Sequence, residues 1–152
     1  MRELLCLGIS HKTAPVSVRE RVALLTRDAE ALCAELVELE RQRAEPAVLQ
    51  ALADRGGDSE ALRSAAFRLT GVDAARHLFQ VTAGLDSMIV GESEIQGQVR
   101  RAYETAHAAG TTGPTTDDLF SSAVRAGRRV RSETGIGAGH SSVSSVAVAL
   151  AS

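Results

Sequence analysis

Residues 84–99, GLDSMIVGESEIQGQV, combine the side chains most able to do chemistry in this chain. Hydroxyl and carboxylate groups flank an apolar triplet, Met88-Ile89-Val90, and such groups can hydrogen-bond a polar ligand. Acidic residues are also favoured in the first turn of a solvated helix, where they face the positive end of the helix dipole. From residue types alone, this structural interpretation is favoured.

Histidine and cysteine are the other candidates for chemistry. An isolated histidine such as His77 is more often a structural residue with a local hydrogen bond, and the loop residue His11 can serve either function or a turn. The two cysteines form neither a disulfide framework nor a metal cluster, and no metal site is expected. Cys6 lies in an apolar run and Cys33 on the apolar face of a predicted helix, so both are interpreted as structural.

Four arginines cluster near the C-terminal end of the last long helical pattern: Arg125, Arg128, Arg129 and Arg131. Their spacing can present a mostly one-sided basic stripe, which would bind phosphates through charge without reading bases. An ordinary solvated face explains the same spacing, and the two interpretations stay open. The glycine run at 135–139 lacks the preceding strand and the GxGxxG spacing of a dinucleotide site.

The elements that must position these residues differ between the two halves of the chain. Residues 4–9 predict a buried strand followed by a loop, a helix is predicted from Thr26, and residues 46–49 and 67–69 predict further strands. After Gly71 the apolar spacing predicts three helices, around residues 75–79, 95–106 and 119–130. The expected class is α+β, with a small sheet lobe over 1–70 and a helical bundle over 71–140.

Bulk composition bounds the class of protein. The chain has 152 residues with a formal net charge of -2, which excludes a globally basic nucleic-acid binder but not a local basic patch. Aromatic residues make up 3%, so base-stacking platforms are not expected. No apolar run approaches the length of a membrane span, and the pattern predicts a soluble, cytoplasmic protein with no membrane partner.

Three ordered stretches resemble the N-terminal catalytic domain of glutamyl-tRNA reductase. They are GISHKTAPVSVRE at 8–20, RHLFQVTAGLDSMIVGESEIQGQV at 76–99 and GRRVRSETGIG at 127–137. The resemblance implies one domain over 1–152 whose sheet lobe is ferredoxin-like. Residues 141–152 would then start a linker helix to an NADPH-binding domain that the chain does not contain.

The resemblance also implies an activity. Members of this family are oxidoreductases that reduce glutamyl-tRNA with NADPH to glutamate-1-semialdehyde, in tetrapyrrole (porphyrin) biosynthesis. A cysteine thiolate holds the glutamyl group as a thioester. The partners expected are glutamyl-tRNA, a second copy in the full-length homodimer, and a glutamate-1-semialdehyde aminomutase as recipient of the aldehyde.

The site residues follow from the same resemblance. His77 would lie near the nucleophile and assist proton transfer. A glutamate-recognition pocket would form above Met88–Val90 from Ser87, Glu92, Ser93, Glu94 and Gln98, with the family's usual glutamine replaced at Glu94. The basic stripe would contact tRNA through Arg125, Arg128 and Arg129.

One departure from the family pattern is decisive for activity. The Ser/Thr-Cys-Asn-Arg-Thr-Glu stretch that carries the nucleophile is missing, and its expected place is between Gln50 and Ala51. The chain as printed is therefore expected to be inactive alone. Two hypotheses stay open: a catalytic and substrate-recognition domain of a larger reductase, or a non-catalytic glutamyl-tRNA-binding or regulatory module that has lost its cysteine.

Overall fold

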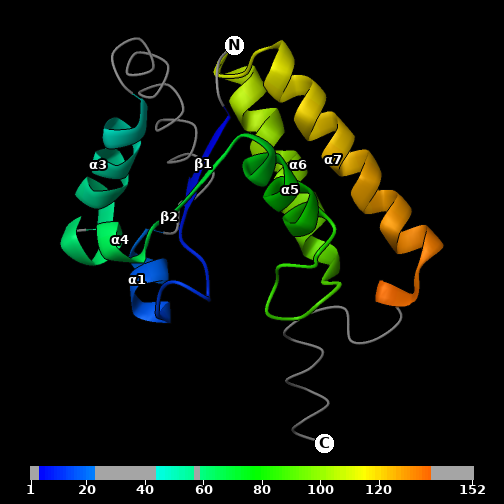
Figure 1. Ribbon diagram of the computed structural model, residues 1–152, viewed down its shortest axis with the longest axis horizontal. Helices are drawn as coiled ribbons and strands as arrows, with labels where there is room; N and C mark the ends of the chain where they lie inside the picture. Colours follow the sequence, from blue (N-terminus) through cyan, green and yellow to red (C-terminus); the bar gives the residue numbers. More distant parts are fainter. Residues whose placement is uncertain (1–3, 23–43, 57–58, 138–152) are drawn as a thin grey trace, which may run out of the picture. The chain divides into compact units, whose positions relative to one another are not determined.

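The computed structural model describes residues 4–22, 44–56 and 59–137 (Figure 1). The chain divides into two compact units. The first, called the sheet unit, comprises residues 1–71 and 105–111; the second, called the helical unit, comprises residues 72–104 and 112–152. The predicted helix from Thr26, with Cys33, lies outside the described residues, as do His140 and the expected linker helix over 141–152.

The described part of the sheet unit contains a two-stranded sheet. β1 (Leu5–Gly8) pairs antiparallel with β2 (Phe67–Thr70), with Leu5 opposite Thr70 and Gly8 opposite Phe67. A side chain at Gly8 would meet the ring of Phe67 at 2.8 Å, so glycine lets the ring lie across the strand. The strands predicted over 4–9 and 67–69 are confirmed, while the ferredoxin-like arrangement stays a prediction.

The second strand predicted in this unit is wrong. Residues 46–49 belong to the helix α3 (Ala44–Gly56), which runs without a break through Gln50 and Ala51. A four-residue apolar run cannot distinguish strand from helix by its period alone, and the surrounding alanines favour helix. Pro46 lies in the first turn of α3, where the missing N–H group would have no intrahelical partner.

Two shorter helices lie among the described residues of the sheet unit, and neither was predicted from the sequence. They are α1 (Val16–Arg21) and α4 (Ser59–Ala65). A small core joins them, built from Ala14, Val18 and Ala65 with Ile9 and Ala61 packed against it. The Arg63 guanidinium of α4 donates a 2.9 Å hydrogen bond to the Gln50 side chain of α3, which ties these two helices together.

All three helices predicted after Gly71 are confirmed. They are α5 (Gly71–Thr82), α6 (Ser93–Ala108) and α7 (Pro114–Glu133), followed by a short 3-10 helix η1 (Gly135–Gly137) (Figure 1). The side-chain amide of Gln96 on α6 donates a 2.9 Å hydrogen bond to the Val124 carbonyl of α7. Small residues allow close packing, since Ala123 and Thr82 are fully buried. The mixed content agrees with the α+β class.

Candidate functional site

The stretch 84–99 follows α5 and forms most of the ten-residue connection between α5 and α6 and the start of α6. Residues 83–92, called the α5–α6 turn, close on themselves because the Gly91 N–H group donates a 2.9 Å hydrogen bond to the Gly84 carbonyl. Both glycines have positive φ, 76° at Gly84 and 86° at Gly91, a region that side chains disfavour. The glycines of the motif therefore shape the turn.

Ser87 contributes to the turn itself. Its hydroxyl lies 3.2 Å from the Gly84 carbonyl oxygen and also hydrogen-bonds the Ile89 carbonyl. A hydroxyl group has one proton to donate but can accept two more hydrogen bonds. Ser87 therefore holds the turn in shape while its oxygen keeps acceptor capacity, and its role as a substrate ligand stays a prediction.

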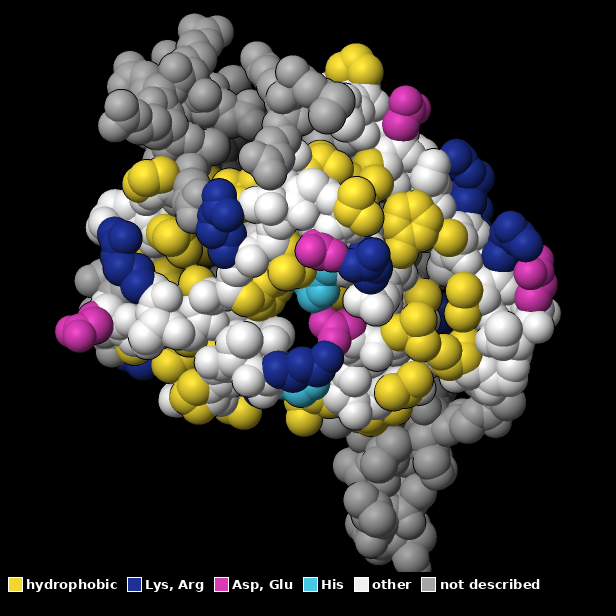
Figure 2. Space-filling view, in the orientation of Figure 1, with side chains coloured by type: hydrophobic (Ala, Val, Ile, Leu, Met, Phe, Trp, Pro, Cys, Tyr) yellow, Lys and Arg dark blue, Asp and Glu magenta, His cyan; other side chains and the backbone are white. Residues whose placement is uncertain are grey.

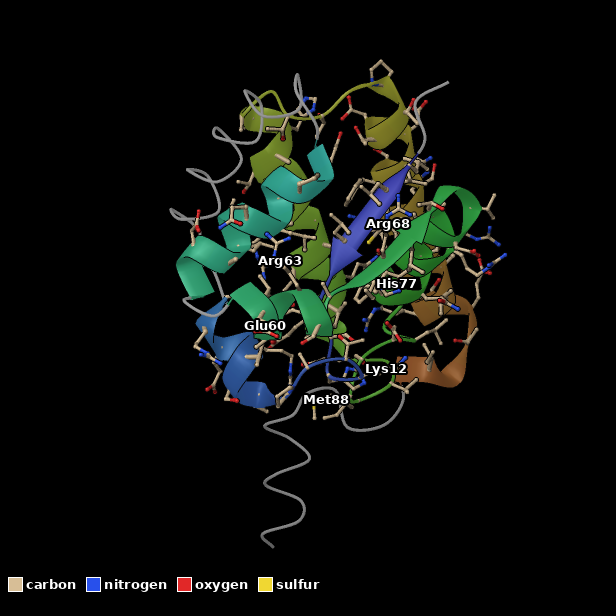
Figure 3. The ribbon with its side chains drawn as sticks, turned by 60° about the vertical axis from the view of Figure 1, so that its left-hand side comes forward. Lys12, Glu60, Arg63, Arg68, His77 and Met88 are labelled. Atoms are coloured by element: carbon tan, nitrogen blue, oxygen red, sulfur yellow. The ribbon has the colours of Figure 1, made fainter. Side chains whose placement is uncertain are left out.

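The apolar triplet does not pack as the sequence predicts. Met88 is 67% exposed and Val90 is 58% exposed, while Ile89 between them is half-buried. The turn is too short and too curved to bury three consecutive side chains on one side. The expectation that Met88 to Val90 pack beneath a pocket is wrong for Met88, which Figure 3 labels, and for Val90.

His77 has an acidic neighbour that the sequence analysis did not single out. Its Nδ1 atom lies 3.6 Å from Oδ2 of Asp86, and their side chains are 20% and 16% exposed. His77 comes from α5 and Asp86 from the turn, so folding of the turn brings them together. A carboxylate facing Nδ1 favours a proton on that nitrogen. In the sequence, the only indication of a role for Asp86 was its position in the motif GLDS.

The remaining predicted pocket residues occupy the turn and the start of α6. Glu92 is half-buried at the end of the turn, and Ser93 begins α6, its side chain being outside the described residues. Glu94, in the first turn of α6, and Gln98, one turn later, are both exposed. Residues four apart share a helix face, so Glu94 and Gln98 form one polar surface. The structure places His77, Asp86, Ser87 and Glu92 on or next to one short turn.

Arg131 differs from its neighbours in the basic stripe. Its guanidinium reaches the α5–α6 turn, where it donates a 3.2 Å hydrogen bond to the Gly91 carbonyl and a second to the Glu92 carbonyl. The sequence analysis grouped Arg131 with the stripe, and spacing alone carried no signal for this contact.

The other three arginines stay exposed on α7. Arg125 donates a 2.8 Å hydrogen bond to the Ser122 hydroxyl, and Arg129 pairs with both carboxylate oxygens of Glu133 at 3.0 and 3.1 Å. The Arg129 hydrogen bonds hold the pKa of Glu133 below its usual value. Figure 2 shows acidic side chains beside several of the basic ones, so the basic character of the surface is partly neutralised.

Cys6, the cysteine within the described residues, does not have the surroundings of a nucleophile. Cys6 lies half-buried in β1, and desolvation raises the pKa of its thiol, which disfavours the reactive thiolate. Within residues 4–22, 44–56 and 59–137, no group of three or more His, Cys, Asp and Glu side chains is placed to hold a metal ion. None of the helices in these ranges combines the length and apolar character needed to cross a membrane.

Comparison with known families identifies the class of protein to which these features belong. Residues 34–134 match the model of the glutamyl-tRNA(Glu) reductase N-terminal domain, so the match includes α5, the turn, α6 and α7. The chain belongs to this family. Its relatives include glutamyl-tRNA reductases from Deinococcus radiodurans, at 38% identity over 98% of the chain, and Rubrobacter xylanophilus, at 42% over 95%.

The chain is shorter than these glutamyl-tRNA reductases in two respects. It spans 46% of the Deinococcus protein and 39% of the Rubrobacter protein. The alignments themselves extend over 166 and 172 positions, more than the 152 residues of the chain. Both relatives therefore carry residues inside the aligned region that this chain lacks.

Proposed function

We propose that the chain is the catalytic and substrate-recognition domain of an NADPH-dependent reductase that converts glutamyl-tRNA to glutamate-1-semialdehyde in tetrapyrrole biosynthesis. Family membership supports the reaction class, and the observation that supports the proposed site is the contact of His77 with Asp86 of the α5–α6 turn, the turn that also contains Ser87 and Glu92. We place the protein in the cytoplasm, where aminoacyl-tRNA is found. A full-length homodimer and an aminomutase that receives the aldehyde complete the proposal.

Glutamate attached to tRNA offers an ammonium group and a side-chain carboxylate to the protein. The half-buried Glu92 suits the ammonium group, because a partly desolvated carboxylate attracts a cation more strongly than an exposed one. Ser87 and Ser93 supply hydroxyls for the carboxylate, and the Glu94–Gln98 face of α6 supplies further polar groups. These residues would hold the glutamyl ester in the orientation that nucleophilic attack needs.

His77 would act on protons during that attack. With its Nδ1 atom facing Asp86, the imidazole would offer Nε2 as the proton acceptor. Proton transfer by a positioned histidine typically contributes on the order of 10²–10⁴-fold to a rate. Asp86 would serve as a positioning residue, because it acts through the imidazole rather than on the substrate.

The nucleophile and the cofactor must come from elsewhere. The longer alignments of the relatives support a segment that this chain lacks; we propose that the segment carries the cysteine and place it between Gln50 and Ala51, where α3 now runs without a break. The residues described here do not fit a dinucleotide, since the glycines that begin the 135–139 run form a 3-10 helix after α7 rather than a strand-to-helix turn. NADPH would be bound by a separate domain.

A different function is favoured by the missing cysteine itself. A chain that keeps the recognition turn but lacks the nucleophile would bind glutamyl-tRNA without reacting, as a regulatory or delivery module. Intact-mass analysis after exposure to glutamyl-tRNA separates the two proposals when it is done on the chain as it stands and on the chain with the relatives' segment restored between Gln50 and Ala51. A glutamyl adduct only on the restored chain supports the reductase domain. Binding without an adduct in either form supports the module.

A prediction for the His77–Asp86 pair uses the restored chain. We expect His77→Asn to lower the rate of glutamyl transfer to the cysteine by about 10²–10⁴-fold, and Asp86→Asn to lower it by on the order of tenfold. Rapid-quench measurement of adduct formation gives both rates. The control is His107→Asn, because His107 is exposed in the last turn of α6. Equal rates in the wild-type and His77→Asn chains would remove His77 from the mechanism.

A prediction for tRNA binding follows from the Arg129–Glu133 pair. Glu133→Gln frees the Arg129 guanidinium for phosphate, and we expect tRNA affinity at low salt to rise by about two- to fivefold. Filter binding over a salt series measures the affinity. The matched control is Glu104→Gln, which removes the same charge from a 3.7 Å pair with Arg100 on α6. A similar gain in both variants would show a net-charge effect and exclude a specific role for the α7 arginines.

A further inference from the structure

We propose that Arg131 is a positioning residue for substrate recognition, which clamps the end of the α5–α6 turn so that Glu92 is held in place. This inference rests on the proposed function. Arg131 lies in the last turn of α7 and is separated from the turn by about forty residues of sequence, yet its two terminal nitrogens donate hydrogen bonds to the consecutive carbonyls of Gly91 and Glu92.

The location of the Arg131 charge supports a role in positioning the α5–α6 turn. A basic residue in the last turn of α7 is favoured by the dipole of that helix. The carbonyls that Arg131 contacts, however, directly precede α6, and a cation is disfavoured beside the N-terminal end of a helix. The Nε atom of Arg131 is also buried without a hydrogen-bond partner, which costs free energy. These costs are offset by a contact that fixes the backbone of the turn.

The geometry of the contact suits a guanidinium better than an ammonium group. Two neighbouring carbonyls point to separate places, and a planar fork with several N–H groups can satisfy both at once. A lysine ammonium also has three N–H groups, but it is a compact charge on a flexible stem and lacks the fixed fork that orients both hydrogen bonds. The side chain of Glu92 starts at the residue whose carbonyl is held, so the clamp limits where its carboxylate can lie.

A second contact reaches the same end of the turn. Gly91 lies so close to the Ile136 carbonyl of η1 that no side chain fits between them. η1 follows α7 directly after Thr134, so Arg131 and Ile136 approach the turn from one continuous segment. The stretch from Arg131 to Ile136 therefore holds the turn by a fork of hydrogen bonds and by close backbone contact.

The test compares Arg131→Met and Arg131→Lys with the control Arg101→Met, which removes an exposed arginine of α6 that belongs neither to the basic stripe nor to the clamp. The probe is glutamyl-tRNA with an amide-linked glutamate, and uncharged tRNA is measured beside it. We expect Arg131→Met to reduce the preference for the charged form by about tenfold while affinity for uncharged tRNA changes by less than about twofold. Arg131→Lys is expected to restore part of the preference.

Hydrogen exchange measures the clamp separately from substrate recognition. The amide of Leu85 donates to the Gln80 carbonyl of α5 and that of Gly91 to the Gly84 carbonyl of the turn, and both should exchange faster in Arg131→Met but not in Arg101→Met. Unchanged exchange, or an unchanged preference for the charged tRNA in a folded variant, overturns the proposal. If the wild-type protein shows no preference for charged over uncharged tRNA, the proposed function fails. Hydrogen exchange alone then decides whether Arg131 holds the turn in place. If Arg131→Met does not fold, the same measurements on Arg131→Lys decide.

Discussion

Replacing Gly127 with alanine is expected to destabilise the helical unit by about 1–3 kcal/mol. A methyl group at Gly127 of α7 would lie 2.8 Å from the Thr82 carbonyl oxygen of α5 and 3.2 Å from the Gln96 side-chain nitrogen of α6. The nearer atom belongs to the backbone and cannot rotate away. Alanine gains roughly 1 kcal/mol over glycine in helix propensity, but separating two packed helices costs more.

The same substitution at Gly97 provides the matched control, with the opposite sign expected. Gly97 lies inside α6, and a methyl group there would meet only the end of the flexible Arg101 side chain at 3.3 Å. Gly97→Ala should therefore stabilise by about 0.5–1 kcal/mol through helix propensity. Urea unfolding followed by circular dichroism measures both variants. Stabilisation by Gly127→Ala would contradict the close crossing of α5 and α7.

Gly91→Ala is expected to cost roughly 2–5 kcal/mol, from two separate effects. The backbone at Gly91 has φ 86°, which alanine adopts only with strain. An added methyl group would also overlap the Ile136 carbonyl, whose carbon it would approach to 2.9 Å. The turn and η1 would have to move apart, so thermal unfolding should show a clear loss of stability and hydrogen exchange should increase in the turn.

Gly110→Ala separates the effect of backbone strain at positive φ from the effect of steric overlap with a neighbouring group. Gly110 has a similar φ of 71°, but a methyl group there would meet no atom within 4 Å among the described residues. This variant should therefore lose only the conformational part, about 1–2 kcal/mol. If the two variants lost equal stability, the close approach between Gly91 and Ile136 would have no energetic weight.

Local sequence patterns predicted those helices and strands whose formation depends on residues close together in the sequence. α6 and α7 have apolar residues at helical spacing over many turns, and β1 is an apolar run that ends in a polar loop, so the period identified each element. α3 was mistaken for a strand because its apolar run is four residues long, too short for a period to show. α1 and α4 are short helices whose apolar residues pack with a shared core, which no local window reveals.

The site residues also fall into two groups, those that the sequence predicted and those that only the tertiary structure revealed. The motif over residues 84–99 identified the family and the polar residues of the turn, because residue types and order are carried by the sequence itself. Asp86 as the neighbour of His77, and Arg131 as the one arginine of its cluster that holds the turn, were decided only by tertiary structure. Both contacts join residues from different elements, and the direction of a long side chain depends on what folding brings beside it.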